Sequence, residues 1–430
     1  MRFRLAPGID HFSELVIATP VVGLSQQTPS LARDLPVAHE PVDRNHRTAT
    51  TQFRQRERFL MIRTQKIDLI QGWCTQPVSG GMRDCSLIVP TYKRASDVER
   101  LLRRLTCHER ESTGSVPYEI VVVDGSPGNA TEEMVRSLSL EGFPFLVKYL
   151  RTPPGLTRQR NVGIAGSSGD YVFFLDDDAL PEPGYFQIIR QVFESDQEQL
   201  IGAVAGCVWN EWNHPLILRW RIRFALGIVP RIEPMRYSHC GTSNPRTMLT
   251  PFTGIREVDL LPGCAFTFRR QVVARERFSL FFEGYSQGED MEMSLRVGQR
   301  WKLVCSGDAR VFHAHTSSGR PASFAKGRME VRNRVFIWRR HSKDQAGLID
   351  RIRMIADFAF LLLVDLAGFF SRPWRIAPIL HGAGVFCGAI ECLVRPPDFN
   401  EESHRVAYVI SLSALAESSQ QSAGTKCEFA

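Results

Sequence analysis

The sequence lacks several features that would point away from an ordinary globular enzyme. Its ten cysteines include no Cys-x-x-Cys pair, which argues against a zinc cluster or a disulfide framework and favours reduced thiols. The N-terminal MRFRLAPGIDHFSELV has no continuous apolar core and no cleavage site, so it does not predict a signal peptide. Lysine is scarce, and the net charge of +7 therefore comes mainly from arginine. This charge favours anionic partners such as nucleotide diphosphates, lipid headgroups or nucleic acid.

Hydrophobic residues at 43% and charged residues at 23% are ordinary for a folded protein. A chain of 430 residues is compatible with one large α/β domain plus appendages. The composition predicts a flexible extension over residues 1–82 and a catalytic domain over 83–340. A basic and apolar helical region over 341–400 and a tail over 401–430 complete the predicted organisation.

From residue 85 onward, strand-like and helix-like stretches alternate. CSLIVP, YEIVVVDGS and DYVFFLDDD read as strands, with amphipathic helical stretches between them. This alternation predicts an α/β fold with a doubly wound, mostly parallel sheet and flanking helices. Ligands bind beyond the carboxyl ends of such strands, where polar residues gather at 91–94, 124–126 and 176–178.

The stretch GDYVFFLDDDALPEP places three carboxylates directly after a buried strand. An aspartyl-phosphate phosphatase would usually have Thr or Val after the second acid, and here Ala179 and Leu180 follow. A capped turn before Pro181 would explain one acid but not three. A divalent cation shared with a substrate diphosphate would offset the repulsion among all three.

The C-terminal third is basic and then apolar. Residues 326–353 carry nine Lys or Arg, and the apolar stretches MIADFAFLLLVDLAGFF and IAPILHGAGVFCGAIECLV follow. Both contain ionisable groups and are near or below the length needed to span a bilayer. Helices lying in an anionic membrane surface fit this pattern, and so does a helical hairpin buried against the main domain.

Five motifs occur in an informative order: CSLIVPTYKR, YEIVVVDGS, LTRQRNVGIAGSSGDYVFFLDDDALPEPGYF, LPGCAFTFRR and GYSQGEDMEMSLR. Together they resemble glycosyltransferase family 2, whose catalytic domain has the GT-A fold. The resemblance covers about residues 83 to 340.

The resemblance implies roles for particular residues. It implies a nucleotide pocket formed by Pro90, Thr91, Tyr92, Arg94, Asp124, Arg160, Asn161 and Asp176. It also implies a divalent metal, Mn²⁺ or Mg²⁺, held by Asp178 and His313. Two other interpretations stay open: Asp124 as a strand-end turn residue and the histidine as part of a half-buried or surface pair.

GYSQGEDMEMSLR matches the segment that supplies the family's catalytic base, which implies that Asp290 accepts the proton of the acceptor hydroxyl. Gly263, Arg270 and Glu289 are the expected acceptor-binding or supporting residues. A second interpretation is that Glu289 and Asp290 only favour a helix N-terminus electrostatically.

The implied function is an inverting, metal-dependent transfer of sugar from a nucleotide diphosphate sugar to a saccharide or lipid-linked acceptor. The family's frequent role implies cell-envelope or exopolysaccharide synthesis, in the cytoplasm and peripheral on the inner face of the cell membrane, without a nucleic-acid partner. A nucleotide-sugar-binding scaffold without activity and a nucleotidyltransferase are the alternatives. The latter would be expected to have a glycine-rich phosphate loop, which IVPTYKRASD lacks.

Overall fold

The structure is a computed structural model that describes residues 13–15, 66–75, 81–282, 284–316, 321–397 and 406–414. Its sheet runs in the order β1-β12-β2-β5-β4-β3-β6-β10-β8-β11-β7, with β9 paired to β11. The strands are β1 Ser13–Leu15, β2 Lys66–Cys74, β3 Met82–Thr91, β4 Pro117–Asp124, β5 Leu146–Arg151, β6 Tyr171–Leu175, β7 Ala179–Pro181, β8 Ile201–Val208, β9 Ile255–Glu257, β10 Ala265–Arg269, β11 Lys302–His313 and β12 Val406–Ala414.

The predicted parallel sheet forms the centre of this larger mixed sheet. Strands β5, β4, β3 and β6 pair in parallel, so their carboxyl ends lie along one edge. On either side the pairing becomes antiparallel, between β2 and β5 and between β6 and β10. The polar residues that end β3, β4 and β6 are therefore brought to one edge, as the sequence pattern predicts.

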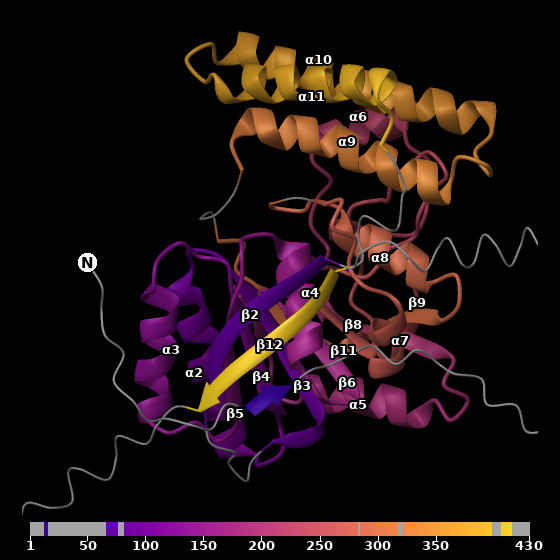
Figure 1. The fold of residues 1–430 in the computed structure, drawn as a ribbon. Helices are drawn as coiled ribbons and strands as arrows, with labels where there is room; N and C mark the ends of the chain where they lie inside the picture. The colour runs from indigo at the N-terminus through magenta and orange to yellow at the C-terminus, as the bar shows by residue number, and fades with distance from the viewer. Residues whose placement is uncertain are drawn as a thin grey trace, which may run out of the picture.

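Helices cover both faces of the sheet, as in a doubly wound fold (Figure 1). They are α2 Ala95–Glu111, α3 Ala130–Leu140, α4 Leu156–Gly166, α5 Tyr185–Ser195, α7 Arg270–Arg275 and α8 Glu289–Val297. Alternate side chains of each strand point to opposite faces. Leu87 of β3 packs in the core that includes α2, α3 and α5, whereas Ile88 packs in the core that includes α4, α7 and α8.

Two outer strands correct the predicted boundaries. Residues 66–74, assigned to a flexible extension, form β2, and residues 406–414, assigned to a tail, form β12. These two strands pair in parallel, and Ile410 of β12 is buried in the core beside α4. The sheet thus recruits segments from both ends of the chain, while residues 16–65 and 415–430 lie outside the described part.

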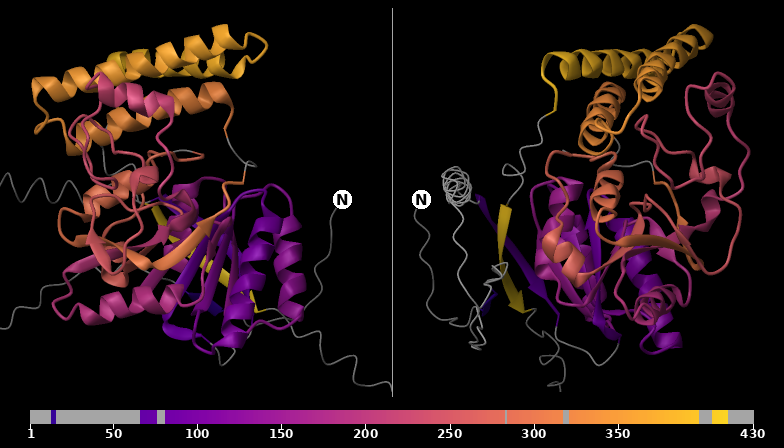
Figure 2. Two further views of the ribbon diagram at one scale, coloured as in Figure 1. Left: turned by 180° about the vertical axis from the view of Figure 1, so that it is seen from behind. Right: turned by 90° about the vertical axis from the view of Figure 1, so that its right-hand side faces the viewer.

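Three long helices form a separate layer above the sheet edge (Figures 1 and 2). They are α9 Ser323–His341, α10 Leu348–Ser371 and α11 Ala377–Val394, and the short α6 Leu218–Ala225 lies beside them. Both α10 and α11 are long and apolar enough to cross a membrane, yet only 17% of the apolar window of each is buried. The hairpin packs on α9, and most of its apolar surface faces outward, which does not match a hairpin buried against the main domain.

Candidate active site

A cavity of about 600 Å³ opens at the carboxyl edge of the central strands. Pro90, Thr91, Tyr92 and Arg94 line one side of it, directly after β3. The other walls contain the three acids after β6, the first turn of α8 and the end of β11. Most of the residues predicted to form the site therefore surround one volume.

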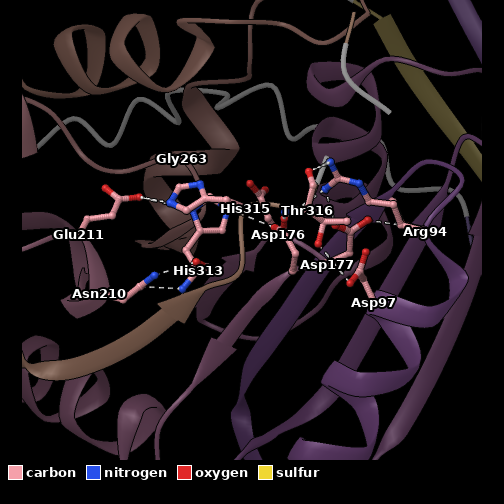
Figure 3. A network of polar contacts seen from close by, with 12 residues as sticks. Arg94, Asp97, Asp176, Asp177, Asn210, Glu211, Gly263, His313, His315 and Thr316 are labelled. Atoms are coloured by element: carbon pink, nitrogen blue, oxygen red, sulfur yellow. Dashed lines mark hydrogen bonds and ion pairs between the residues drawn. The ribbon is translucent and has the colours of Figure 1, made fainter. Parts of the chain in front are cut away.

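Each of the three consecutive acids has a cationic partner, which explains how their charges are tolerated. Figure 3 shows Asp176 and Asp177 together with Arg94 and His313. Asp176 accepts a hydrogen bond from Arg160 at 3.3 Å, and Asp177 accepts from Arg94 at 3.0 Å. Asp178 lies 3.1 Å from His313 Nε2 and 3.5 Å from Arg94. Fixed cations beside the carboxylates offset the repulsion that the sequence predicts.

The middle acid, Asp177, is a buried structural residue. Its other oxygen accepts a hydrogen bond from the Thr91 hydroxyl at 2.8 Å, and only 3% of the residue is exposed. Burial raises the pKa of Asp177 to about 7, although Arg94 and Thr91 act in the opposite direction. Asp177 thereby ties the end of β6 to the end of β3, and all three acids line the cavity.

His313 is held on both sides of its ring. Asn210 accepts from the backbone N–H of His313 at 2.9 Å and donates its side-chain amide to the His313 carbonyl at 2.9 Å. Glu211 Oε1 lies 3.5 Å from His313 Nδ1, opposite the Asp178 contact. Burial alone would lower the pKa of His313, but its contacts with Asp178, Cys264 and Glu211 raise it. Asn210 and Glu211 follow β8 in the short 3₁₀ turn Trp209–Glu211.

Arg160 joins the acidic strand end to helix α8. Only 1% of it is exposed, and its guanidinium donates to Glu289 at 2.7 Å and to the Gly263 carbonyl at 2.8 Å. The guanidinium also lies over the rings of Phe266 and Phe278. Because these contacts add to its bond with Asp176, Arg160 holds three parts of the cavity wall in fixed positions.

Asp290 lies in the first turn of α8 and lines the cavity. Its Oδ2 accepts the backbone N–H of Gly263 at 3.0 Å, and a Cβ placed on Gly263 would lie 2.9 Å from that oxygen. A glycine at residue 263 therefore lets the carboxylate approach the backbone closely. Burial and the neighbouring Asp290 raise the pKa of Glu289 to about 8, whereas Arg160 lowers it.

The donor atoms of Asp176, Asp178 and His313 suit a divalent cation. One oxygen from each carboxylate and one imidazole nitrogen lie within 4.8 Å of one another. Two oxygens and a nitrogen are a donor set that Mn²⁺ accepts readily, since imidazole suits transition metals better than Mg²⁺. A second group, Glu211, His313 and His315, meets the same distance criterion. Glu211 does not line the cavity, whereas all three members of the first group do, which favours the first group.

Three predicted residues lie elsewhere or are engaged in other contacts. Asp124 is buried, lies outside the residues lining the cavity, and accepts from Ser126 N–H and Tyr149 O–H, both at 2.8 Å. This is the strand-end turn that the sequence left open. The side chain of Asn161 donates to the Phe278 carbonyl and accepts from the Phe278 backbone N–H. Asn161 likewise does not line the cavity.

Arg270 is the clearest correction. It lies at the start of α7, where it donates to the carbonyls of Ile164 and Gly169 and to Ser167. These partners precede β6, so they lie at the end of that strand opposite the acids. Arg270 stabilises the connection from α4 to β6 and is not placed to touch an acceptor in the cavity.

Sequence reasoning missed several residues of the site. Asn210 and Glu211 hold His313, Arg246 holds Glu211, and Thr316 donates its N–H to Asp178 at 2.8 Å. They belong to irregular segments after β8, before β9 and after β11, which carry no periodic pattern. The sequence WNEWN, with polar residues directly after a predicted strand, was the available signal for Asn210 and Glu211.

Comparison with known proteins gives a family match for the central part of the chain. Residues 86–274 match the family described as glycosyl transferase family 2. An uncharacterized glycosyltransferase from Haemophilus influenzae is 35% identical over 111 residues, which are 26% of this chain and 35% of that protein. The glycosyltransferase AglE from Haloferax volcanii is 28% identical over 102 residues, covering 24% and 33% of the two chains. The chain thus spans about a third of the length of these curated relatives.

A mannosyltransferase from Pyrobaculum calidifontis, solved in complex with GDP-Man and Mn²⁺, is similar in structure with a TM-score of 0.44 and 16% identity. The match covers 81% of this chain and 96% of that one. The protein is an α/β protein with an acidic cavity at the carboxyl edge of its central strands. On the sequence match, residues 86–274 are similar to glycosyl transferase family 2.

Proposed function

We propose that the protein transfers a sugar from a nucleotide diphosphate sugar to a hydroxyl group of an acceptor, with inversion at the anomeric carbon. The observation that carries this proposal is the convergence of Asp176, Asp178, His313 and Asp290 on one cavity. The first three would supply metal ligands, and the last would supply a carboxylate from α8. A divalent cation bound there would neutralise the charge of the departing diphosphate.

The residues of this chain would share the remaining work. Pro90 to Tyr92 line the side of the cavity assigned to the nucleotide, and Arg160 fixes Asp176 beside them. Asp290 would accept the proton of the attacking hydroxyl, and the Gly263 N–H keeps its carboxylate oriented. Attack from the face opposite the leaving diphosphate inverts the anomeric configuration.

The proposal that the protein associates with a membrane rests on where the side chains of α10 and α11 lie: charged groups are paired inside the helical layer, and large apolar side chains are exposed. Two acids of α10 are paired within the helical layer: Asp357 pairs with Arg334 at 2.9 Å, and Asp365 pairs with His381 at 2.7 Å. Large apolar side chains face outward, such as Leu363, Phe370 and Phe386 at 62%, 72% and 57% exposure. Water-exposed helices show the opposite distribution, so a lipid environment fits this surface.

We therefore expect the hairpin to lie in an anionic membrane surface and bring the cavity to a saccharide or lipid-linked acceptor. Arg372, Trp374 and Arg375 lie exposed in the turn between the two helices, where interfacial anchors are common. Cell-envelope or exopolysaccharide synthesis at the inner face of a cell membrane is the setting that this proposal favours. The scaffold and nucleotidyltransferase alternatives lack a supporting observation in the cavity.

The test is a donor-hydrolysis screen of the whole chain with UDP-, dTDP- and GDP-sugars, with Mn²⁺, with Mg²⁺ and with a chelator. We expect nucleotide release from one donor class, dependent on the metal and increased by membrane extract. Folded protein that releases nucleotide from no donor, with extract present, would contradict the enzyme proposal. Sedimentation with anionic vesicles at low salt, weakening as salt is added, tests the membrane part separately.

A further inference from the structure

Helix α6 belongs to the chain segment between β8 and β10, yet it carries an exposed apolar surface of its own. Leu218 and Leu226 are 68% and 67% exposed, and Ile217 just before the helix is 53% exposed. Arg223 and Phe224, within the same helix, are buried. The helix therefore buries a charged residue and exposes apolar ones, the same inverted distribution that α10 and α11 show.

The buried side of α6 is fixed to α10. Arg223 Nε donates to Asp357 of α10 at 2.6 Å, and its guanidinium lies over the ring of Phe360. Arg353 of α10 donates to the carbonyl of Gly227, just after α6, at 3.1 Å. Figures 1 and 2 show α6 at the same end of the molecule as the three long helices. These contacts make α6 and the hairpin one structural unit.

Positive charges accompany the apolar side chains of α6. Arg219, Arg221 and Arg231 are exposed within or shortly after the helix. Exposed apolar side chains interleaved with arginines are typical of a helix that lies in the headgroup region of an anionic bilayer. Anionic lipid headgroups would supply counter-charges for these arginines, whereas an apolar surface on a protein partner would not.

We propose that α6 is a second membrane contact, which docks on anionic lipid together with the α10–α11 hairpin. This inference rests on the proposed membrane association and adds a contact from outside the C-terminal region. Glu211, which lies beside His313, is joined to α6 by the short segment 212–217. Two-point docking would hold the cavity at a fixed orientation to the membrane, where a lipid-linked acceptor would be presented.

The experiment compares five full-length proteins by sedimentation with vesicles of phosphatidylcholine alone and of phosphatidylcholine with phosphatidylserine. They are the wild type, an apolar α6 variant with Leu218→Ser and Leu226→Ser, a charge variant of α6 with Arg219→Gln and Arg221→Gln, a hairpin variant with Leu363→Ser and Phe370→Ser, and the control Leu140→Ser. Leu140 is 70% exposed at the end of α3, outside the helical layer. Because all these side chains are largely exposed, we expect every variant to fold, as circular dichroism would verify.

We expect the α6 variant to partition about tenfold more weakly onto anionic vesicles, because two apolar side chains no longer enter the interface. The control should bind like the wild type. A pair of charge changes, Arg219→Gln with Arg221→Gln, should weaken binding to anionic vesicles and leave the weak binding to neutral vesicles unchanged.

Two results would overturn this inference while leaving the proposed membrane association intact. One is unchanged partition of both α6 variants when the hairpin variant has lost binding. The other is a wild-type dimer that the Leu218 and Leu226 changes dissociate without affecting vesicle binding, which would assign α6 to contacts between copies of the chain. Failure of the wild type to bind either vesicle would refute the membrane association itself.

Discussion

Replacing Gly263 by alanine tests how closely Asp290 must be positioned. An added Cβ would lie 2.9 Å from Asp290 Oδ2 and 3.0 Å from Asp290 Cβ, whereas ordinary contact begins at 3.4 Å. The carboxylate must therefore move by about half an ångström. The backbone N–H that Asp290 accepts and the carbonyl that Arg160 contacts are both retained, so the change acts on position more than on hydrogen bonding.

A displacement of 1 Å in a catalytic group costs about 10²-fold in rate, so half of that displacement should cost roughly tenfold. We expect Gly263→Ala to reduce the transfer rate by this factor, with donor affinity and melting temperature nearly unchanged. Gly128→Ala is the matched control, because a Cβ there would meet no atom within 4 Å. Transfer at the wild-type rate would refute the argument that Gly263 positions the base, and an equal loss of donor affinity would indicate a distorted cavity instead.

Three further changes have distinct expected results. Asp178→Ala should abolish metal-dependent donor binding in calorimetry with Mn²⁺, whereas retained dependence would mean that the metal site is misplaced. Glu211→Gln should weaken the binding of Mn²⁺ by about 10-fold to 100-fold, because Glu211 orients His313. The matched control Glu198→Gln, at an exposed residue, should bind Mn²⁺ like the wild type. Glu292→Gln should reduce the free energy of unfolding by about 3–5 kcal/mol, since it removes a fully buried partner of Arg296 and Arg340; a loss below 1 kcal/mol in denaturant titrations would contradict this.

Glu292 should also make the stability of the protein depend on pH. Burial would raise the pKa of Glu292, but the charge of Arg296 holds the pKa below its usual range. A depressed folded-state pKa gives stability that is fully present above the unfolded value of about 4.3 and is lost as pH falls through the folded value. Wild-type stability should therefore fall more steeply than that of Glu292→Gln below about pH 4. Parallel curves for the two proteins would show that Glu292 is not responsible.

The central sheet and one wall of the site could be predicted because they follow periodic rules. Uninterrupted apolar runs mark β3, β4 and β6 as strands buried on both faces, and parallel pairing then brings their polar ends together. The three acids after β6 were an informative signal because their repulsion requires partners. Arg94 and Arg160, both named from the family resemblance, turned out to be two of those partners.

The other parts of the fold and of the site could not be predicted, because they depend on contacts between segments that are distant in the chain. Asp124 was expected to face the nucleotide, but Tyr149 on the neighbouring strand β5 donates to it, and no local pattern reveals that pairing. Strands β2 and β12 pair with each other across more than 300 residues, so each alone resembles an ordinary short apolar stretch. Glu211 and Arg246 lie in irregular segments, where position is set by tertiary contacts that sequence periodicity does not encode.

The most direct test of the account is Asp290→Asn, measured for transfer rate, donor binding and melting temperature on one preparation. Asparagine keeps the size of the side chain but cannot accept a proton near neutral pH, so transfer should fall roughly 10²-fold to 10⁴-fold. Donor affinity should hardly change, because Asp290 belongs to α8, whereas the lining residues 90–94 lie at and just after the end of β3. Near-wild-type transfer with a lower melting temperature would instead assign Asp290 to the stability of the α8 N-terminus and contradict its role as the base.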